Sequence, residues 1–256
     1  MLAFLRLFFA GLLVLTSQAF AATVQDEQGS FTLEKTPQRI VVLELSFADA
    51  LAAVNVSPVG IADDNDPSRI LSDVSAHFTT WQSVGTRAQP SLEAISALKP
   101  DLIIADSSRH AGIYKALQAI APVLLLKSRN ETYAENLQSA AIIGKVVGKE
   151  NEMTQRLALH HQRMQTFATQ LPKGANVVFG TSREQQFNLH SRESITGSEM
   201  TAQGLTPPAA VNDAPMTPVG QEQLLAINPE WLTATNSHKQ RIVRSWQAHH
   251  HLQAMM

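Results

Sequence analysis

The sequence predicts an α/β protein of two Rossmann-like lobes, each built around a sheet, with one long α-helix joining them. Short apolar runs alternate with helical patterns over residues 40–126, which is typical of a parallel sheet covered on both faces. An unbroken helical pattern follows over 150–171, and it is longer than an ordinary crossover helix. A second, shorter alternating series comes after it. One continuous sheet is the less favoured alternative.

The first residues have the pattern of a secretory signal peptide. One cation, Arg6, precedes the apolar stretch 7–15, and small residues stand at the positions that decide cleavage. We therefore assign 1–21 to the signal peptide and expect cleavage between Ala21 and Ala22. An uncleaved anchor is disfavoured because a polar segment follows closely. Export from the cytoplasm follows, and a bacterial periplasm fits best.

The first lobe is predicted over 22–147, starting with a hairpin over 24–33 that turns at Gly29. Its predicted strands are short apolar runs, at 40–43, 59–62, 102–105 and 123–126. Its predicted helices carry apolar residues on one face, at 47–54, 92–98 and around 114–120. Pro100 and Pro122 end the last two helices, because proline cannot continue a helix.

The connecting helix is predicted over 148–172. Met153, Leu157 and Met164 recur near the helical period and leave a polar opposite face. The Pro-Lys-Gly sequence at 172–174 ends this pattern.

The second lobe is predicted over 173–256. Its expected strands lie at 176–180 and 231–235. Its expected helices lie near 201, at 221–226 and from 240 onwards.

Composition excludes several classes of partner and chemistry. The formal net charge is -2 and the pI is about 6.5, without a basic run or basic amphipathic helix, so neither nucleic acid nor a membrane surface is an expected partner. The chain contains no cysteine, which excludes thiolate nucleophiles, disulfides and cysteine metal sites. It also excludes a lipid anchor on cysteine, so we expect a protein free in its compartment.

Three arginines follow short apolar runs. Arg87, Arg109 and Arg183 each stand a few residues after an apolar run. Ligands of open α/β sheets collect beyond the carboxyl ends of the strands, so these guanidinium groups are expected to face one crevice. A guanidinium matches a carboxylate with two parallel hydrogen bonds, and Ser107 and Ser108 could add donors. The sequence therefore predicts a site for a carboxylate-rich anion.

A solvated surface side chain is the competing interpretation of each arginine, and it is the favoured one for Arg69. A hydrolase is the competing class of function. The chain contains no Gly-x-Ser-x-Gly elbow, no phosphate-binding Gly-x-x-x-x-Gly-Lys-Ser/Thr loop and no His-Glu-x-x-His. Only Gly-Thr-Ser at 180–182 loosely matches a nucleophile turn.

Several segments resemble the helical-backbone (class III) periplasmic binding proteins, which serve ATP-driven importers of iron chelates, haem and cobalamin. The segments are RIVVL at 39–43 and PSLEAISALKPDLII at 90–104. Three further segments are similar to the ferric dicitrate-binding members: ELSFADAL at 44–51, DSSRH at 106–110 and GTSREQQFNLH at 180–190. The resemblance runs from the signal peptide to about residue 247. It implies a monomeric solute-binding protein that delivers ferric dicitrate to an inner-membrane ABC permease.

The resemblance also implies roles for individual residues. The arginines would grip the citrate around the iron, so the protein would supply no metal ligand and need no cofactor. Glu93 and Glu222 match the two positions, one in each lobe, that dock arginines of the permease. The simpler interpretation of Glu93 is a carboxylate placed favourably at a helix start.

The sequence departs from this family in two ways. Members usually continue beyond a position like 256, so we expect an incomplete second lobe with apolar surface exposed near Trp231 and Trp246. Ile195 stands where a cleft-wall tryptophan is expected. A non-functional remnant of a truncated gene stays open as an alternative.

Other ligands and modes of binding also stay open. Other carboxylate siderophores suit the same arginines, whereas an aromatic content of 6% makes haem or cobalamin a poorer match. If the protein ligated iron directly, Tyr114 and Tyr133 would be the candidate ligands, but packing is the favoured interpretation of both residues. The histidines at 160–161 and 249–251 are neighbours on predicted helices and point in different directions.

Overall fold

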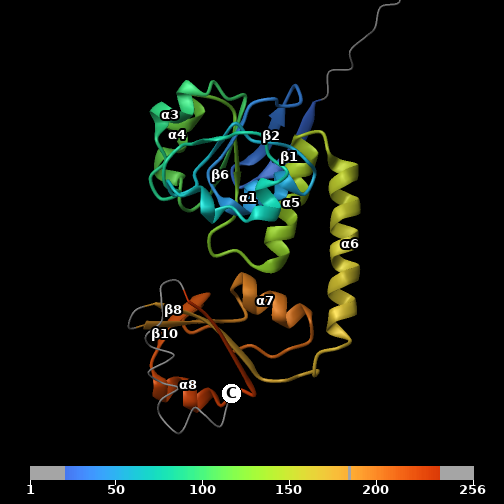
Figure 1. Ribbon diagram of the computed structural model, residues 1–256, viewed down its shortest axis with the longest axis vertical. Helices are drawn as coiled ribbons and strands as arrows, with labels where there is room; N and C mark the ends of the chain where they lie inside the picture. The colour runs from blue at the N-terminus through green and yellow to red at the C-terminus, as the bar shows by residue number, and fades with distance from the viewer. Residues whose placement is uncertain (1–20, 184–185, 237–256) are drawn as a thin grey trace, which may run out of the picture.

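The computed structural model describes residues 21–183 and 186–236, and it has two lobes with separate sheets (Figure 1). The long helix α6 (Glu150–Ala168) runs along one side of the molecule, past both lobes (Figure 1). The two-lobe α/β fold predicted from the sequence is confirmed. The predicted signal peptide lies outside the described residues, apart from its last position.

The sheet of the first lobe is entirely parallel. Its strand order is β5-β4-β3-β6-β7, so β3 is the central strand. The strands are β3 (Ile40–Val42), β4 (Gly60–Ile61), β5 (Gln82–Ser83), β6 (Leu102–Asp106) and β7 (Val123–Leu126). Beside the sheet, β1 (Ala22–Asp26) and β2 (Gly29–Leu33) form the expected hairpin, in which Gly29 adopts a φ of 115°.

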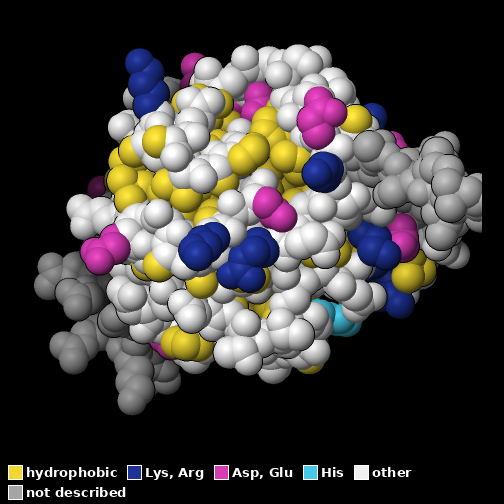
Figure 2. All heavy atoms as spheres, turned by 90° about the horizontal axis from the view of Figure 1, so that it is seen from above, with side chains coloured by type: hydrophobic (Ala, Val, Ile, Leu, Met, Phe, Trp, Pro, Cys, Tyr) yellow, Lys and Arg dark blue, Asp and Glu magenta, His cyan; other side chains and the backbone are white. Residues whose placement is uncertain are grey.

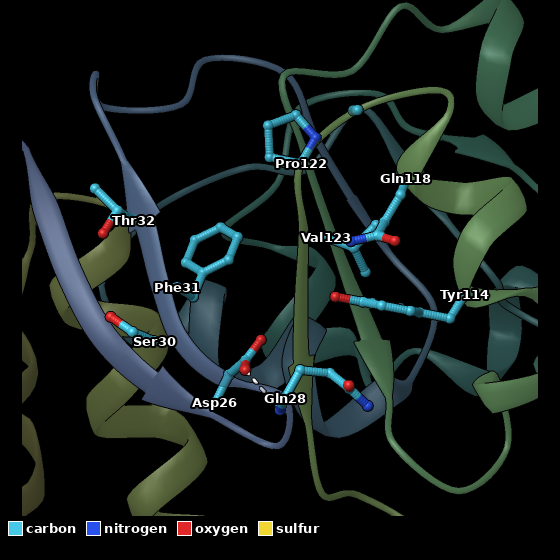
Figure 3. Close-up of a pocket in the computed structure, with 10 residues that line it drawn as sticks. Asp26, Gln28, Ser30, Phe31, Thr32, Tyr114, Gln118, Pro122 and Val123 are labelled. Atoms are coloured by element: carbon cyan, nitrogen blue, oxygen red, sulfur yellow. Dashed lines mark hydrogen bonds between the residues drawn. The ribbon is translucent and has the colours of Figure 1, made fainter.

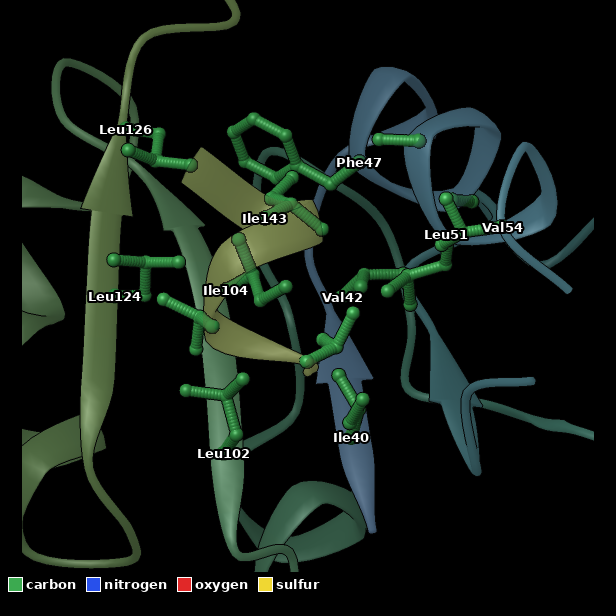
Figure 4. Packing of buried hydrophobic residues seen from close by; sticks show 14 of the residues in the cluster. Ile40, Val42, Phe47, Leu51, Val54, Leu102, Ile104, Leu124, Leu126 and Ile143 are labelled. Carbon is green, nitrogen blue, oxygen red and sulfur yellow. The ribbon is translucent and has the colours of Figure 1, made fainter. Parts of the chain in front are cut away.

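Helices cover both faces of this sheet because its strands are apolar on both sides. Val42, Ile104 and Leu124 face α1 (Leu45–Ala52) and α5 (Tyr133–Val146) (Figure 4). The residues between them along the strands face α3 (Leu92–Ala97) and α4 (Tyr114–Gln118). Alternation with period two therefore places the apolar side chains of β3, β6 and β7 in one of two cores.

Several short elements of the first lobe are not anticipated by the sequence pattern. They are β5, α2 (Ser72–Ser75), η1 (Pro67–Arg69) and η2 (Ala111–Ile113). The longest omission is α5, which begins at a capping box formed by Thr132 and Glu135. That box is a sequence signal for a helix start.

The second sheet is mixed. Its order is β10-β9-β8-β11, where β8 (Val177–Arg183) runs parallel to β11 (Trp231–Asn236). The strands β9 (Gln186–His190) and β10 (Met216–Val219) are antiparallel to their neighbours, and the sequence pattern did not predict either of them. The predicted helices appear as α7 (Ile195–Ala202) and α8 (Gln221–Ile227), whereas the helix expected from 240 lies outside the described residues.

The core of the second lobe is small. It consists of Val178, Phe187, Leu189 and Leu224 with partly buried neighbours. Trp231 is 61% exposed, as expected, and Trp246 lies outside the described residues. Within 21–183 and 186–236, none of the helices has the length and hydropathy needed to cross a bilayer.

Candidate ligand-binding cleft

Polar side chains gather at the carboxyl ends of the parallel strands in the first lobe. Glu44 follows β3, Asp64 follows β4, and Arg87 comes after β5. Arg109 follows β6, and Arg129 follows β7. The carboxyl ends of parallel strands share one edge of a sheet, so all of these loops meet there.

Arg87 is held by two carboxylates. Its Nε and Nη2 donate to Oδ2 of Asp64 at 3.0 and 2.8 Å, and its backbone N–H donates to Oδ1 at 2.9 Å. Its Nη1 lies 3.8 Å from Oε2 of Glu44. Burial raises the pKa of Asp64, but the hydrogen bonds from Arg87 outweigh burial and hold that pKa below its usual range. Arg87 is therefore a positioned, partly buried cation.

Arg109 contacts the same buried Glu44 from the other side. Its Nε lies 2.6 Å from Oε1 of Glu44. This close ion pair acts to lower the pKa of Glu44. The structure thus brings Arg87 and Arg109 together, as the sequence predicted, around a carboxylate that the prediction did not include.

Glu44 is only 3% exposed. Burial raises the pKa of Glu44 to about 7, although Arg109 and Arg87 both act to lower it. A charged form and a neutral form are therefore close in free energy near neutral pH.

Asp106 orders the loops that carry Arg109 and Arg129. Its Oδ1 accepts from the backbone N–H groups of Ser108 and Arg109 at 3.0 and 2.6 Å. Its Oδ2 accepts from the backbone N–H groups of Ser128 and Arg129 at 2.8 and 2.9 Å. Burial raises the pKa of Asp106, but these hydrogen bonds outweigh it, so the pKa lies below its usual value. Asp106 therefore stays ionised.

His110 links the loops after β5 and β6. Its Nδ1 accepts from the backbone N–H of Asp106 at 2.9 Å, so Nε2 carries the proton and donates to the carbonyl of Arg87 at 2.9 Å. Burial lowers the pKa of His110, and the ring is neutral. The ring of His110 therefore connects the backbone of Arg87 to that of Asp106.

Ser107 and Ser108 form hydrogen bonds that hold the loop after β6. Both donors of Ser108, its N–H and its hydroxyl, are engaged by Asp106. The backbone N–H of Ser107 donates to the carbonyl of Leu126 at 2.8 Å. The Ser107 hydroxyl is the remaining donor of the predicted pair.

Arg183 is the last residue of β8, where it pairs with Gln186 across the β8–β9 hairpin. The structure places its backbone in the second lobe, and its side chain lies outside the described positions. Arg69 is exposed and forms an ion pair with Asp64 at 3.3 Å. Its surface position agrees with the sequence-based interpretation.

The lobes touch where α5 meets α7. The backbone N–H of Tyr133 donates to Oγ of Ser198 at 2.8 Å, and the Tyr133 hydroxyl bonds Nε2 of His160 at the same distance. Ile195, at the first position of α7, is 37% exposed. Tyr133 therefore serves the contact between the lobes and the connecting helix.

The sequence signal for the missed acidic residues lies in the strands. Glu44, Asp64 and Asp106 each stand within two residues of the end of a predicted apolar strand. The prediction includes arginines in this position but not these carboxylates. In the structure, Glu44 and Asp64 contact Arg87, and Asp106 orders the loop that carries Arg109.

A cavity of about 450 Å³ lies away from this cluster, between the β1–β2 hairpin and α4 (Figure 3). Asp26, Phe31 and Tyr114 line it, and Oδ1 of Asp26 accepts from the backbone N–H of Gln28 at 2.7 Å (Figure 3). Its one charged lining residue is anionic, so it does not suit a carboxylate ligand. In the described part of the chain, no three His, Cys, Asp or Glu side chains are grouped to hold a metal ion.

The two glutamates predicted to dock the permease lie at helix starts. Glu93 is exposed in the first turn of α3, and Glu222 is exposed in the first turn of α8. Both helices lie on the side of the molecule away from α6 (Figure 1).

Seen from above the first lobe, charges of both signs surround a hollow lined by apolar side chains (Figure 2).

Known proteins similar to this chain are binding proteins. A family described as "Periplasmic binding protein" matches residues 40–255. The chain is 70% identical to the Fe(3+) dicitrate-binding periplasmic protein FecB of Escherichia coli (strain K12), over 96% of this chain and 82% of that protein. It is 43% identical to the Fe(3+)-citrate-binding protein YfmC of Bacillus subtilis (strain 168), over 87% of this chain and 71% of that protein.

Solved structures share the fold. Staphylococcus aureus SirA in complex with staphyloferrin B aligns with a TM-score of 0.74 at 18% identity, covering 89% of this chain and 83% of SirA. The petrobactin-binding protein YclQ of Bacillus subtilis aligns with a TM-score of 0.73 at 21% identity, covering 92% of this chain and 85% of YclQ.

Proposed function

Because this chain belongs to the periplasmic binding protein family, we propose that it is the solute-binding component of an ABC importer and that its ligand is ferric dicitrate. The observation that carries the proposal is the pair of partly buried guanidinium groups, Arg87 and Arg109, at the carboxyl edge of the sheet. The high identity to a relative that is named for ferric dicitrate binding supports the choice of ligand.

The chemistry of the ligand fits this pair of cations. Citrate coordinates the iron and presents carboxylates outward. The protein therefore binds the citrate and does not contact the iron ion. Each desolvated guanidinium–carboxylate contact contributes about 1.5–3 kcal/mol. With Arg183 added from the second lobe, three such contacts supply much of the ~8 kcal/mol that a micromolar affinity requires. Ser107 adds a hydroxyl donor, and neither a cofactor nor a protein metal ligand takes part.

The test is calorimetric titration of the mature chain with ferric citrate, metal-free citrate and a hydroxamate siderophore. Ferric citrate should bind most tightly. Equal binding of all three ligands, or of none, would contradict the assigned specificity. The proposal also predicts that the protein does not hydrolyse generic esters or phosphates, which separates it from the hydrolase alternative.

Replacing both arginines, Arg87→Gln with Arg109→Gln, should weaken ferric citrate binding by at least about 100-fold, since two contacts of ~1.5 kcal/mol or more disappear. Arg69→Gln is the matched control, because Arg69 also pairs with Asp64 but is exposed. Its affinity should stay at the wild-type value. Undiminished binding by the double variant would refute the role of the arginines.

Delivery to the permease is proposed to depend on Glu93 and Glu222, one exposed carboxylate in each lobe. Glu93→Ala and Glu222→Ala should leave the affinity for ferric citrate intact and abolish uptake of iron by cells. Glu152→Ala, an exposed glutamate on α6, is the control and should transport normally. Normal iron uptake by both variants would contradict the docking role of Glu93 and Glu222.

The proposed mature protein begins at Ala22, after cleavage of 1–21, and acts as a monomer in the periplasm. Its proposed parts are a first lobe at 22–147, a connecting helix at 148–172 and a second lobe at 173–256. N-terminal sequencing of the exported protein tests the cleavage site. Limited proteolysis, with cuts expected near 148 and 172, tests the boundaries.

A further inference from the structure

Glu44 lies between the two arginines assigned to the ligand. Its carboxylate is 2.6 Å from Nε of Arg109 and 3.8 Å from Nη1 of Arg87. Oε1 of Glu44 and Nε of Arg109 are both buried. Glu44 is therefore an internal counter-anion between the two guanidinium groups.

Further charges surround Glu44. Asp106, at the end of β6, and Glu131, before α5, repel its ionised form. On the other side, Asp64 shares Arg87 with it through much shorter contacts, at 2.8–3.0 Å. Burial raises the pKa of Glu131 to about 7, as it does for Glu44, but Glu131 forms no contact with either arginine and bonds Asn136 instead.

We propose that Glu44 neutralises Arg87 and Arg109 in the empty cleft, and that it takes up a proton when ligand carboxylates replace it on these arginines. The inference rests on the proposed function, because it needs an anionic ligand at this pair. The proton balance is simple: one proton leaves the solvent and binds a carboxylate oxygen of Glu44, which becomes a neutral acid. The ligand carboxylates remain ionised against the two guanidinium groups.

The direction of the pH effect follows from linkage. A ligand anion beside Glu44 raises its pKa further, so the bound state holds more protons than the empty state. Affinity therefore falls as the pH rises above about 7, by up to about tenfold per pH unit for one proton. Below that pH, Glu44 is already protonated in the empty protein, and the affinity levels off.

The experiment compares the wild type with Glu44→Gln by titrating ferric citrate at several pH values between 6 and 8. Each titration is done in PIPES and in ACES, whose different ionisation enthalpies report the protons exchanged. Proton exchange by the ligand itself is common to both proteins and cancels in the difference. We expect the wild type to take up more protons than E44Q, and E44Q to bind more tightly than the wild type at pH 8.

Glu199→Gln is the matched control, since burial also raises the pKa of Glu199, whereas Glu199 is not among the charges that act on Glu44. It should keep the wild-type proton uptake. Equal uptake and equal pH profiles in the wild type and E44Q would overturn the inference while leaving the proposed function in place. Failure of the wild type to bind ferric citrate at every pH would overturn both.

If E44Q does not fold, the wild type itself still decides the question. Carboxyl ¹³C resonances of labelled glutamates can be titrated with and without gallium(III) citrate, a diamagnetic substitute for the ferric chelate. The midpoint of the Glu44 resonance should rise on binding. An unchanged midpoint would overturn the inference.

Discussion

Two carboxylates at neighbouring strand ends show how hydrogen bonding decides the charge of a buried residue. Asp106 and Glu44 are both almost fully buried. Asp106 accepts four backbone N–H groups and its pKa is lowered, whereas Glu44 faces two arginines and its pKa is raised. The hydrogen bonds to Asp106 outweigh its burial, whereas Arg87 and Arg109 do not outweigh the burial of Glu44.

Asp106→Asn should destabilise the first lobe at neutral pH, because an amide presents its NH₂ to two backbone N–H groups. The expected loss is on the order of 3 kcal/mol, measured by urea unfolding at pH 7. The exposed Asp73→Asn is the control and should change little.

The pH dependence of this loss has a definite sign. The folded-state pKa of Asp106 is lowered, so its stabilising contribution is present above the unfolded pKa and disappears as the pH falls through the folded one. The difference between the wild type and D106N should therefore shrink below about pH 4. A difference that is constant from pH 7 to pH 3 would show that the charge of Asp106 is irrelevant.

The two long helices differ in how well the sequence predicts them. α6 lies on the outside of the molecule, so its apolar residues form one stripe and the pattern predicts it. α5 packs against α1, α6, α7 and β1, and its buried residues include Ser139 and Gly144, which are not large apolar residues. The capping box at Thr132 is the clearest sequence signal for this helix. Polar and small residues at buried positions weaken the apolar pattern by which an amphipathic helix is predicted.

The junction of these helices depends on a small residue. A Cβ placed on Gly144 in α5 would lie 2.4 Å from Cβ of Met153 in α6. Gly144→Ala should therefore force the helices apart and reduce stability by about 1–3 kcal/mol in thermal or urea unfolding. Gly112→Ala, where a Cβ meets nothing within 4 Å, should be neutral. Equal stability of the two variants would show that the junction yields freely.

The whole molecule is two lobes beside one continuous helix. A continuous helix resists bending more than a pair of extended linkers does, so ligand binding should close the lobes only slightly. The absence of cysteine makes a direct measurement possible, because two introduced cysteines are the only labelling sites.

Spin labels at Lys115→Cys in α4 and Ala226→Cys in α8 should report the movement of the lobes, since both positions are exposed. The distance between the labels should change by less than ~5 Å, the rise of one helical turn, on addition of ferric citrate. Each single-cysteine variant serves as the control for labelling. A larger change would identify α6 as a hinge.

Local patterns were sufficient for the hairpin, for four of the five parallel strands and for α1, α3 and α4 of the first lobe, and for selecting Arg87 and Arg109. A strand that is apolar on both faces and ends in polar residues is a local feature, and the carboxyl ends of parallel strands meet at one edge by geometry. The β8–β9 hairpin was not predicted, because no Gly- or Asn-based turn marks it.

The sequence by itself determined the two α/β lobes, the helix between them and the two arginines at strand ends. Only the tertiary structure decided that Glu44 lies between those arginines and that Asp64 holds one of them. The physical reason is the order of the strands. Arg87 and Arg109 come from strands that are not neighbours, and the central strand β3 places Glu44 in the gap. That order depends on packing over the whole lobe, which no local pattern encodes.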